Sequence, residues 1–294
     1  MQSRRSFLTT VAAGVGVAAL RPSLALAADH GPIKTVLNGP VGLQLWSLRE
    51  FGPKDLPGTL AKVRAMGFRE VEGAGLWGHS LADFKAALDK AGLNCVSAHA
   101  GLDVLTGDLA GTIAQAKAVG AKHLVCPWIP HEKGFTREDA LKTGAAFNTF
   151  GKAAKDAGLT FGYHPHGYEF VPSPEGQLFD TLLGATDPAL VEFQVDTFHA
   201  YHAGADPVKL IEKLKGRVRS LHLKDQKKGY PREAGKDGAT PDADVPVGTG
   251  EIDFPAVLRA AMKSGCSLYF IEDESTDPLG HIPQSIAYLE GVKL

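Results

Sequence analysis

A helix-like pattern that ends at glycine and leads directly into a short apolar run recurs along this chain. The glycines at this junction are Gly67, Gly92, Gly120, Gly158 and Gly265. Glycine readily adopts the left-handed backbone conformation that closes a helix, so its recurrence at corresponding places indicates a repeated helix-to-strand unit. Because strands connected through helices run parallel, the repeat predicts a parallel sheet.

The apolar runs give eight candidate strands, and the segments between them give eight candidate helices. The predicted strands are Val41–Leu48, Arg69–Glu72, Cys95–His99, His123–Pro127, Thr160–His164, Val191–Asp196, Val218–His222 and Leu268–Glu272. The predicted helices are Leu56–Met66, Ser80–Ala91, Leu109–Val119, Arg137–Ala157, Gly176–Ala185, Asp206–Leu214, Phe254–Ser264 and Pro283–Leu289. This alternation predicts an α/β fold, the (β/α)8 TIM barrel, with a doubly wound open sheet as the alternative.

Residues that can bind a divalent metal stand at the ends of four consecutive predicted strands. They are His164, Asp196, His222 and Glu272. The carboxyl ends of barrel strands meet at one mouth, so these side chains are expected to share one space. Two imidazoles and two carboxylates suit a borderline or hard ion. We therefore predict one divalent metal site, with manganese first and zinc, cobalt or magnesium as alternatives; for any single residue, a simple buried hydrogen bond is the alternative.

More histidines lie close to these strand ends. His99 ends the third predicted strand, His166 follows His164 by two residues, and His199 follows Asp196 by three. Each could orient a ligand, contact substrate or transfer a proton. We assign His99 and His166 to catalysis together with Glu272, and His199 to substrate binding; His202 is expected to be a loop residue in water.

Four other residues at the strand exits are candidates for contacts with substrate. Trp46 and Trp128 could pack on the apolar faces of a sugar ring, or pack against the mouth itself. Glu72 could bind a sugar hydroxyl or reach the metal through water, or it could be a salt-bridged rim residue. Lys224 is assigned to catalysis because an ammonium stabilises a developing oxyanion, with a solvated lysine as the alternative.

The connection from Asp225 to Asp253 is long, polar and rich in glycine and proline. Connections of this length tend to be lids or binding loops, and a disordered surface insertion is the alternative. Its last part, Gly248–Asp253, resembles a phosphate cradle only loosely. We interpret it as a turn in which Asp253 begins the next helix as N-cap.

The first 27 residues have the pattern of an export signal. Adjacent Arg4 and Arg5 precede an uncharged run from Thr9 to Leu20 and an Ala25-Leu26-Ala27 cleavage motif. The arginine pair specifies a twin-arginine signal. The run is shorter than the ~20 residues that span a bilayer, which disfavours a membrane anchor. We expect a periplasmic protein that is not embedded in the membrane, with residues 28–294 forming a single barrel domain.

Charge and cysteine content exclude two classes of protein. The net charge is −2 and the pI about 6.6, so the chain lacks the basic character of a nucleic-acid-binding protein. Three cysteines, an odd number without a CxxC spacing, argue against a disulfide framework. They are expected to be buried thiols.

Several motifs, taken in order, resemble the sugar phosphate isomerase/epimerase family of xylose isomerase-like barrels. They are GLQLWSLRE, GFREVEGAG, GYHPHGYEF, VDTFHAYHAGADP, SLHLKD, GTGEIDF and YFIEDESTDP. The resemblance implies that His164, Asp196, His222 and Glu272 are the metal ligands. One departure is His164, since ketose 3-epimerases carry there a glutamate that works with the last-strand glutamate. Glu169 stands too far along the chain to replace it without a bulge.

The resemblance implies a metal-dependent sugar isomerase or epimerase that abstracts a proton next to a carbonyl, through an enediolate. A 3-keto-glycoside lyase or dehydratase is the alternative, because its elimination begins with the same proton abstraction. A non-catalytic sugar-binding barrel is an alternative of another class, whereas phosphodiester hydrolysis conflicts with the acidic balance. The expected partner is a small sugar or glycoside, and the sequence leaves homo-oligomerisation open.

Overall fold

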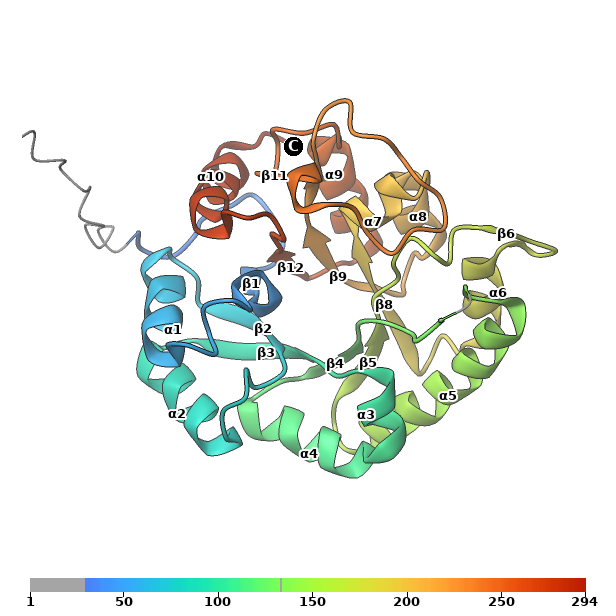
Figure 1. Cartoon of the computed structure of the whole chain (residues 1–294), viewed down its shortest axis with the longest axis horizontal. Helices are drawn as coiled ribbons and strands as arrows, with labels where there is room; N and C mark the ends of the chain where they lie inside the picture. Colours follow the sequence, from blue (N-terminus) through green and yellow to red (C-terminus); the bar gives the residue numbers. More distant parts are fainter. Residues whose placement is uncertain (1–29, 133) are drawn as a thin grey trace, which may run out of the picture.

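The strands of this protein close into a barrel surrounded by helices (Figure 1). The computed structural model describes residues 30–132 and 134–294. All neighbouring strands of the barrel are parallel, in the order β1-β12-β9-β8-β5-β4-β3-β2. The predicted (β/α)8 barrel is therefore confirmed, and the open sheet is excluded. The predicted signal segment, residues 1–27, lies outside the described residues.

The barrel strands lie where the apolar runs predicted them. They are β1 Val41–Gln44, β2 Glu70–Ala74, β3 Asn94–His99, β4 His123–Cys126, β5 Thr160–Tyr163, β8 Val191–Asp196, β9 Val218–Leu223 and β12 Leu268–Ile271. The largest difference is in the first one, because the chain turns into a 3-10 helix, η1 Leu45–Leu48, directly after Gln44. The Gln44 side chain caps this helix by accepting a hydrogen bond from the Trp46 backbone N–H.

The outer helices also lie at the predicted segments, although the last one begins at Pro278 rather than at the predicted Pro283, which lies inside it. They are α1 Leu56–Ala65, α2 Leu81–Ala91, α4 Leu109–Val119, α5 Arg137–Asp156, α6 Leu178–Ala185, α8 Pro207–Lys213, α9 Phe254–Ser264 and α10 Pro278–Gly291. Two short helices were not predicted, α3 Leu102–Gly107 and α7 Thr197–His202. Each has only six residues, too few to show a helical period. In the described part of the chain, no helix is long and apolar enough to cross a membrane.

Side chains alternate along the barrel strands between two very different surroundings. Outward-facing Phe161 packs on Phe147 of α5, and Phe193 packs on Phe179 of α6, with ring centroids 5.4 and 5.5 Å apart. Inward-facing side chains near the mouth are polar and form one buried hydrogen-bonded group: Gln44, Glu72, Ser97, Gln194 and Ser220. The period of two along a strand separates the two sets.

The long connection after β9 is partly ordered by a short hairpin. Strand β10 Asp225–Gln226 pairs antiparallel with β11 Asp244–Val245, preceded by η2 Pro241–Ala243. The residues between them are tied to the barrel mouth, since the Glu233 N–H donates to the His202 carbonyl at 2.7 Å. A second small hairpin, β6 Pro172–Ser173 with β7 Gly176–Gln177, precedes α6. The β10–β11 connection is thus attached to the mouth, as expected of a binding loop.

Candidate metal and substrate site

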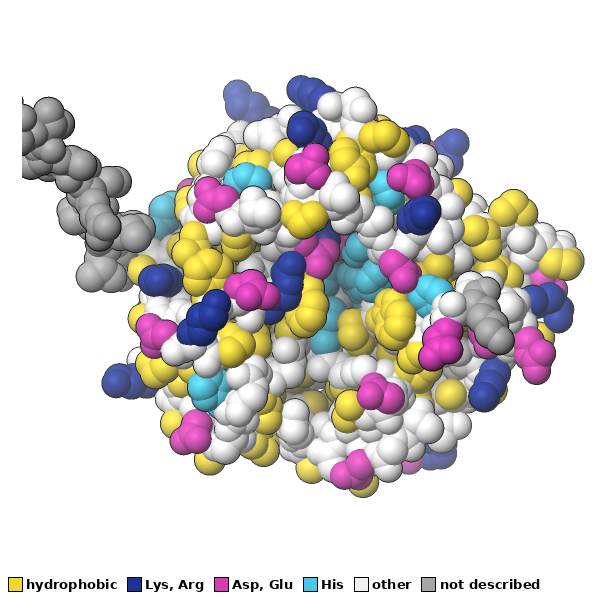
Figure 2. Space-filling view, in the orientation of Figure 1, with side chains coloured by type: hydrophobic (Ala, Val, Ile, Leu, Met, Phe, Trp, Pro, Cys, Tyr) yellow, Lys and Arg dark blue, Asp and Glu magenta, His cyan; other side chains and the backbone are white. Residues whose placement is uncertain are grey.

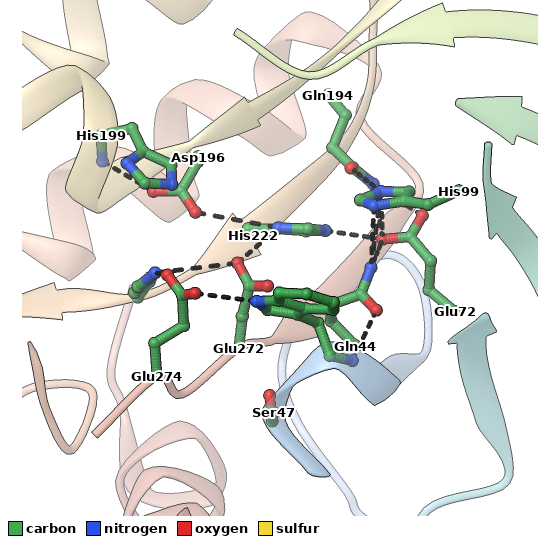
Figure 3. A network of polar contacts seen from close by, with 12 residues as sticks. Gln44, Ser47, Glu72, His99, Gln194, Asp196, His199, His222, Glu272 and Glu274 are labelled. Carbon is green, nitrogen blue, oxygen red and sulfur yellow. Dashed lines mark hydrogen bonds and ion pairs between the residues drawn. The ribbon is translucent and has the colours of Figure 1, made fainter. Parts of the chain in front are cut away.

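The four predicted metal ligands converge at the carboxyl ends of their strands. The Nδ1 atom of His222 lies 3.0 Å from Glu272 Oε2 and 3.7 Å from Asp196 Oδ2, as Figure 3 shows. The ring of His164 is 4.5 Å from that of His222, centroid to centroid. Ligand atoms of His164, Asp196 and His222 all lie within 4.8 Å of one another. All four side chains are buried, so the structure brings together the residues that the sequence predicted.

The hydrogen bonding of this group fits a divalent ion. Asp196 Oδ1 accepts from the His199 N–H at 2.7 Å. Asp196 Oδ2 and His164 Nδ1, by contrast, are buried and have no hydrogen-bond partner among the described residues. Buried polar atoms are nearly always paired, so these two atoms point to a missing common partner. Two nitrogen and two oxygen donors suit zinc, manganese or cobalt.

Glu72 supports this group from inside the barrel. It accepts a hydrogen bond from His222 Nε2 at 2.6 Å and others from Gln44 and Gln194 (Figure 3). The Ser97 hydroxyl donates a further hydrogen bond to it. The Glu72 side chain is fully buried. Glu72 is therefore not a residue of the rim, whereas its contact with substrate or, through water, with the metal stays a prediction. Hydrogen bonds from carboxylates to the second nitrogen of a metal-binding histidine fix the ring orientation, and Glu72 is placed to do this for His222.

Charges within the group determine which side chains carry protons. Burial alone would favour neutral Glu272, but the charges of His222 and Lys224 and the hydrogen bond from His222 lower its pKa to about 2. Burial likewise opposes a charged His222, yet Glu272 and Glu72 together raise its pKa to about 10. Asp196 has a pKa raised to about 7, chiefly by burial. The proton on Nδ1 of His222 thus faces Glu272 and Asp196. A metal ion held by these residues would take the place of this proton.

Lys224 is buried beside Glu272 rather than solvated. Its ammonium pairs with Glu274 and lies 4.0 Å from Glu272 and 3.9 Å from Asp244. These carboxylates raise the pKa of Lys224 even though burial opposes the charge. The predicted position of Lys224 at the site is correct, and the solvated alternative is wrong. Its charge is already balanced by Glu274, which sequence analysis missed.

A cavity of about 780 Å³ opens above these residues. Figure 2 looks onto this hollow and shows histidine side chains gathered in it. His99, His164, His166, His199 and Glu272 line one part, as the strand-end positions predicted. The remaining lining includes apolar residues, among them Ala74, Ala100, Val104 and Pro127, and the polar residues Asp108, Thr112 and Gln115. The cavity therefore offers both ionisable groups and apolar surface to a ligand.

The two tryptophans lie at the edge of this cavity. Trp46 and Trp128 both line it and are 45% and 40% exposed. The indole N–H of Trp46 donates to Glu274 Oε1 at 2.9 Å. Glu274 follows Glu272 by two residues, so alternation along an extended segment was the signal that could have found it. Both indoles are open to a ligand rather than packed away.

A family model described as a xylose isomerase-like TIM barrel matches residues 60–292. The chain belongs to this family. An inosose dehydratase from Clostridium tetani is 32% identical over 154 residues, which are 49% of this chain and 50% of that protein. The chain thus spans about half the length of the curated relatives it matches.

Two solved structures superpose on most of the chain. A sugar phosphate isomerase/epimerase from Parabacteroides distasonis has a TM-score of 0.70 and 25% identity, covering 86% of this chain and 98% of that chain. The IOLI protein with a binding zinc atom has a TM-score of 0.64 over 84% and 94% of the two chains. At 17% identity, the second likeness shows the fold alone.

The structure also decides three sequence-based expectations about single residues. His202 is buried, not in water, because it lies in α7, where it stacks on Phe198 and contacts Gln226 Oε1 at 3.1 Å. His199 is buried in the same helix but faces the cavity. Glu169 is fully buried and binds the Tyr163 hydroxyl and the His166 N–H. It therefore does not replace the glutamate that this chain lacks at His164.

The β10–β11 connection borders the site, but its glycine-rich end is a turn. Residues 237–241 and Asp244 line a smaller hollow of about 290 Å³ that also touches His166, Lys224 and Glu274. The N–H groups of Gly248, Gly250 and Ile252 donate to the carboxylate of Asp225. This cradle is thus filled by the chain's own aspartate, and Asp253 caps α9 as predicted.

Proposed function

We propose that this protein is a divalent-metal-dependent enzyme that removes a proton from the carbon next to a sugar carbonyl. The supporting observation is the convergence of His164, Asp196, His222 and Glu272 under one large cavity that also has aromatic and apolar residues in its lining. Apolar surface suits the faces of sugar rings, and the ionisable groups suit the reacting carbonyl. Isomerisation or epimerisation is the first candidate reaction.

The same four residues would hold the ion, which as a Lewis acid stabilises negative charge on the carbonyl oxygen. The carboxylate of Glu272 lines the cavity and is deprotonated, so it can accept the proton. Returning the proton to another atom requires a second group. The rings of His166 and His99 line the same cavity. Burial lowers the pKa of His166 to about 4, which keeps this ring neutral in the free protein.

Lys224 and Glu72 assist without needing to touch substrate. The ammonium of Lys224 favours the carboxylate form of Glu272. The carboxylate of Glu72 holds Nε2 of His222, so that Nδ1 faces Asp196 and Glu272. Trp46 and Trp128 would orient the ring of the sugar at the cavity edge. Each role follows from the contacts of these side chains, with the ion supplying only the charge stabilisation.

A lyase or dehydratase is the second candidate, favoured by the identity to inosose dehydratase. The first proton abstraction is the same. A substituent on the next carbon then leaves with the bonding electrons, and a protonated side chain delivers a proton to it. With His164 in place of a second carboxylate, a cavity histidine such as His99 or His166 could deliver this proton after it has taken up the one removed in the first step. The two reactions differ after the shared step. In isomerisation or epimerisation the proton is returned to the substrate and the substituent stays, whereas in elimination the substituent leaves.

Proton exchange with solvent tests the shared step before the product is known. Protein loaded with manganese, zinc or cobalt is incubated in deuterated water with free ketoses and 3-keto-glycosides, and products are followed by NMR. Deuterium next to the carbonyl in a rearranged sugar supports the isomerase, and release of the substituent supports the lyase. Neither exchange nor product with any ion would overturn the proposal in favour of a sugar-binding barrel.

We also propose that residues 1–27 export the folded protein through the twin-arginine route, on the arginine pair and cleavage motif of the sequence. Replacing Arg4 and Arg5 by lysine should leave the protein uncleaved in the cytoplasm of its host. Cell fractionation with N-terminal sequencing checks this. An unchanged, cleaved periplasmic product from the lysine variant would contradict it.

A further inference from the structure

Three histidines on the cavity side form a cluster of their own. His164, His166 and His199 each offer a ring nitrogen, and these atoms lie within 4.8 Å of one another. The ring centroids are 4.2 Å apart for His166 and His199, 4.9 Å for His164 and His166, and 5.7 Å for His164 and His199. Of the three, only His164 also belongs to the group around His222.

The chain builds this cluster from two segments that are fixed in place. His164 and His166 alternate after β5 with Pro165 between them, which directs both side chains to the same side. His199 lies in the first turn of α7, whose N-cap, Asp196, accepts its backbone N–H. All three residues line the large cavity. An ion in solution can therefore reach the cluster through the mouth.

The ring nitrogens of the cluster lack partners of their own. Nδ1 of each of the three histidines is buried and makes no hydrogen bond within the described part of the chain. His164 and His199 are only 3% and 5% exposed. Burying one polar atom without a partner is costly. Three rings that each bury an unpaired nitrogen, and that can bring one nitrogen each to within 4.8 Å of the others, indicate a ligand that all three share.

We propose that His164, His166 and His199 form a second cation site, which takes a borderline divalent ion such as zinc or cobalt. Three imidazoles and an open position towards the cavity match the donor set of zinc sites that bind a further molecule. Manganese and magnesium prefer oxygen donors, so they remain with Asp196, His222 and Glu272. The inference does not depend on the reaction proposed above.

Sharing of His164 does not prevent both sites from being filled. If His164 turns to the cluster, the first site keeps Asp196, His222 and Glu272, which are still three ligands from the chain. Three protein ligands are sufficient for a metal ion with an open position. Zinc in the second site would occupy the rings of His166 and His199, and would leave His99 as the cavity histidine that is free to transfer a proton.

Counting bound ions tests the second site directly. The full-length protein is stripped with a chelator and titrated with cobalt or manganese, and bound metal is measured after gel filtration. We expect about two equivalents of cobalt but about one of manganese. The double variant His166→Ala, His199→Ala should retain one equivalent of cobalt. The variant Asp196→Asn, Glu272→Gln should also retain one, with a visible spectrum typical of nitrogen ligands.

His79→Ala is the matched control, since His79 hydrogen-bonds to the Gly52 carbonyl through its ring and lies apart from the cavity. It should bind cobalt like the parent. If the double histidine variant unfolds, His166→Gln replaces it and should weaken the second equivalent about tenfold or more. The proposal of a second site would be overturned if the parent bound only one equivalent of cobalt. It would also be overturned if the parent and the double histidine variant bound the same number of equivalents. Failure of the deuterium exchange assay would speak only against the proposed reaction.

Discussion

Two regions of the molecule are held together in different ways. One is the shell, where the outward-facing side chains of the strands pack on the helices, and the other is the interior of the barrel mouth. In the shell, Phe161 and Phe193 need only apolar neighbours of suitable shape. In the interior, Gln44, Glu72 and Gln194 each need a particular partner, because a buried polar group that loses its partner is destabilising. The shell therefore stabilises the fold with interchangeable contacts, whereas the interior uses specific contacts to position a site.

The comparison predicts opposite effects for substitutions in the two regions. The largest change in activity is expected for Glu272→Gln, which removes a predicted ligand and proton acceptor while keeping the size of the side chain. Turnover should fall by about 10³-fold or more, since a missing catalytic group has effects of this order. The melting temperature should stay close to that of the parent. Kinetics and calorimetry measure both, and a fully active variant would show that the site assignment is wrong.

The largest change in stability is expected for Phe161→Ala in the shell. Truncating a fully buried phenylalanine costs about 3–5 kcal/mol of unfolding free energy. The metal content per folded molecule should not change, because Phe161 faces α5 rather than the mouth. Denaturant unfolding and metal analysis check the two parts. Leu141→Ala, at a residue 42% exposed, is the control and should be close to neutral. Loss of metal from folded Phe161→Ala protein would break the separation between the two regions.

A smaller effect on the site is expected for Glu72→Gln in the interior. The amide keeps the shape but removes the charge that holds Nε2 of His222. Loss of such a supporting carboxylate lowers metal affinity by about 10–100-fold, whereas removal of a ligand should abolish binding. Competition titration with a chromophoric chelator measures the affinity. Unchanged affinity would mean that Glu72 fills space and does not position His222.

The smallest effect is expected from thiol reagents. Cys95, Cys126 and Cys266 are buried, and burial raises the pKa of each thiol to about 12. Thiolates, which are the reactive form, should be almost absent at pH 8. A colorimetric thiol reagent should label none of them in the native protein and all of them in denaturant. Rapid native labelling would show that the shell opens locally.

The difference between the shell and the interior also explains which features of the structure could be predicted from the sequence. The apolar runs and the glycines after the helices predicted the barrel because they reflect local periodicity. The predicted ligands His164, Asp196, His222 and Glu272 stand at strand ends, where position alone indicates a shared mouth. These four residues converge as soon as the strands close into a barrel.

The interior was not predictable in the same way. Glu72 is hydrogen-bonded to Ser97, Gln194 and His222, which lie 25, 122 and 150 residues away along the chain. No local pattern distinguishes such a residue from a rim glutamate, so the sequence could not exclude a position of Glu72 at the rim. His202 was misplaced for a related reason, since α7 is too short to be recognised and its burial depends on the β10–β11 connection.

The contact between Glu72 and His222 joins the second strand to the seventh of the eight along the chain. Neither half of the polypeptide contains both partners, and β1 contributes Gln44 to the same group. A nascent chain that has not yet made its last strands therefore has no complete set of donors. The proposed metal site should therefore bind an ion only after the last strand has closed the barrel. Uptake of the ion would then report that folding is complete.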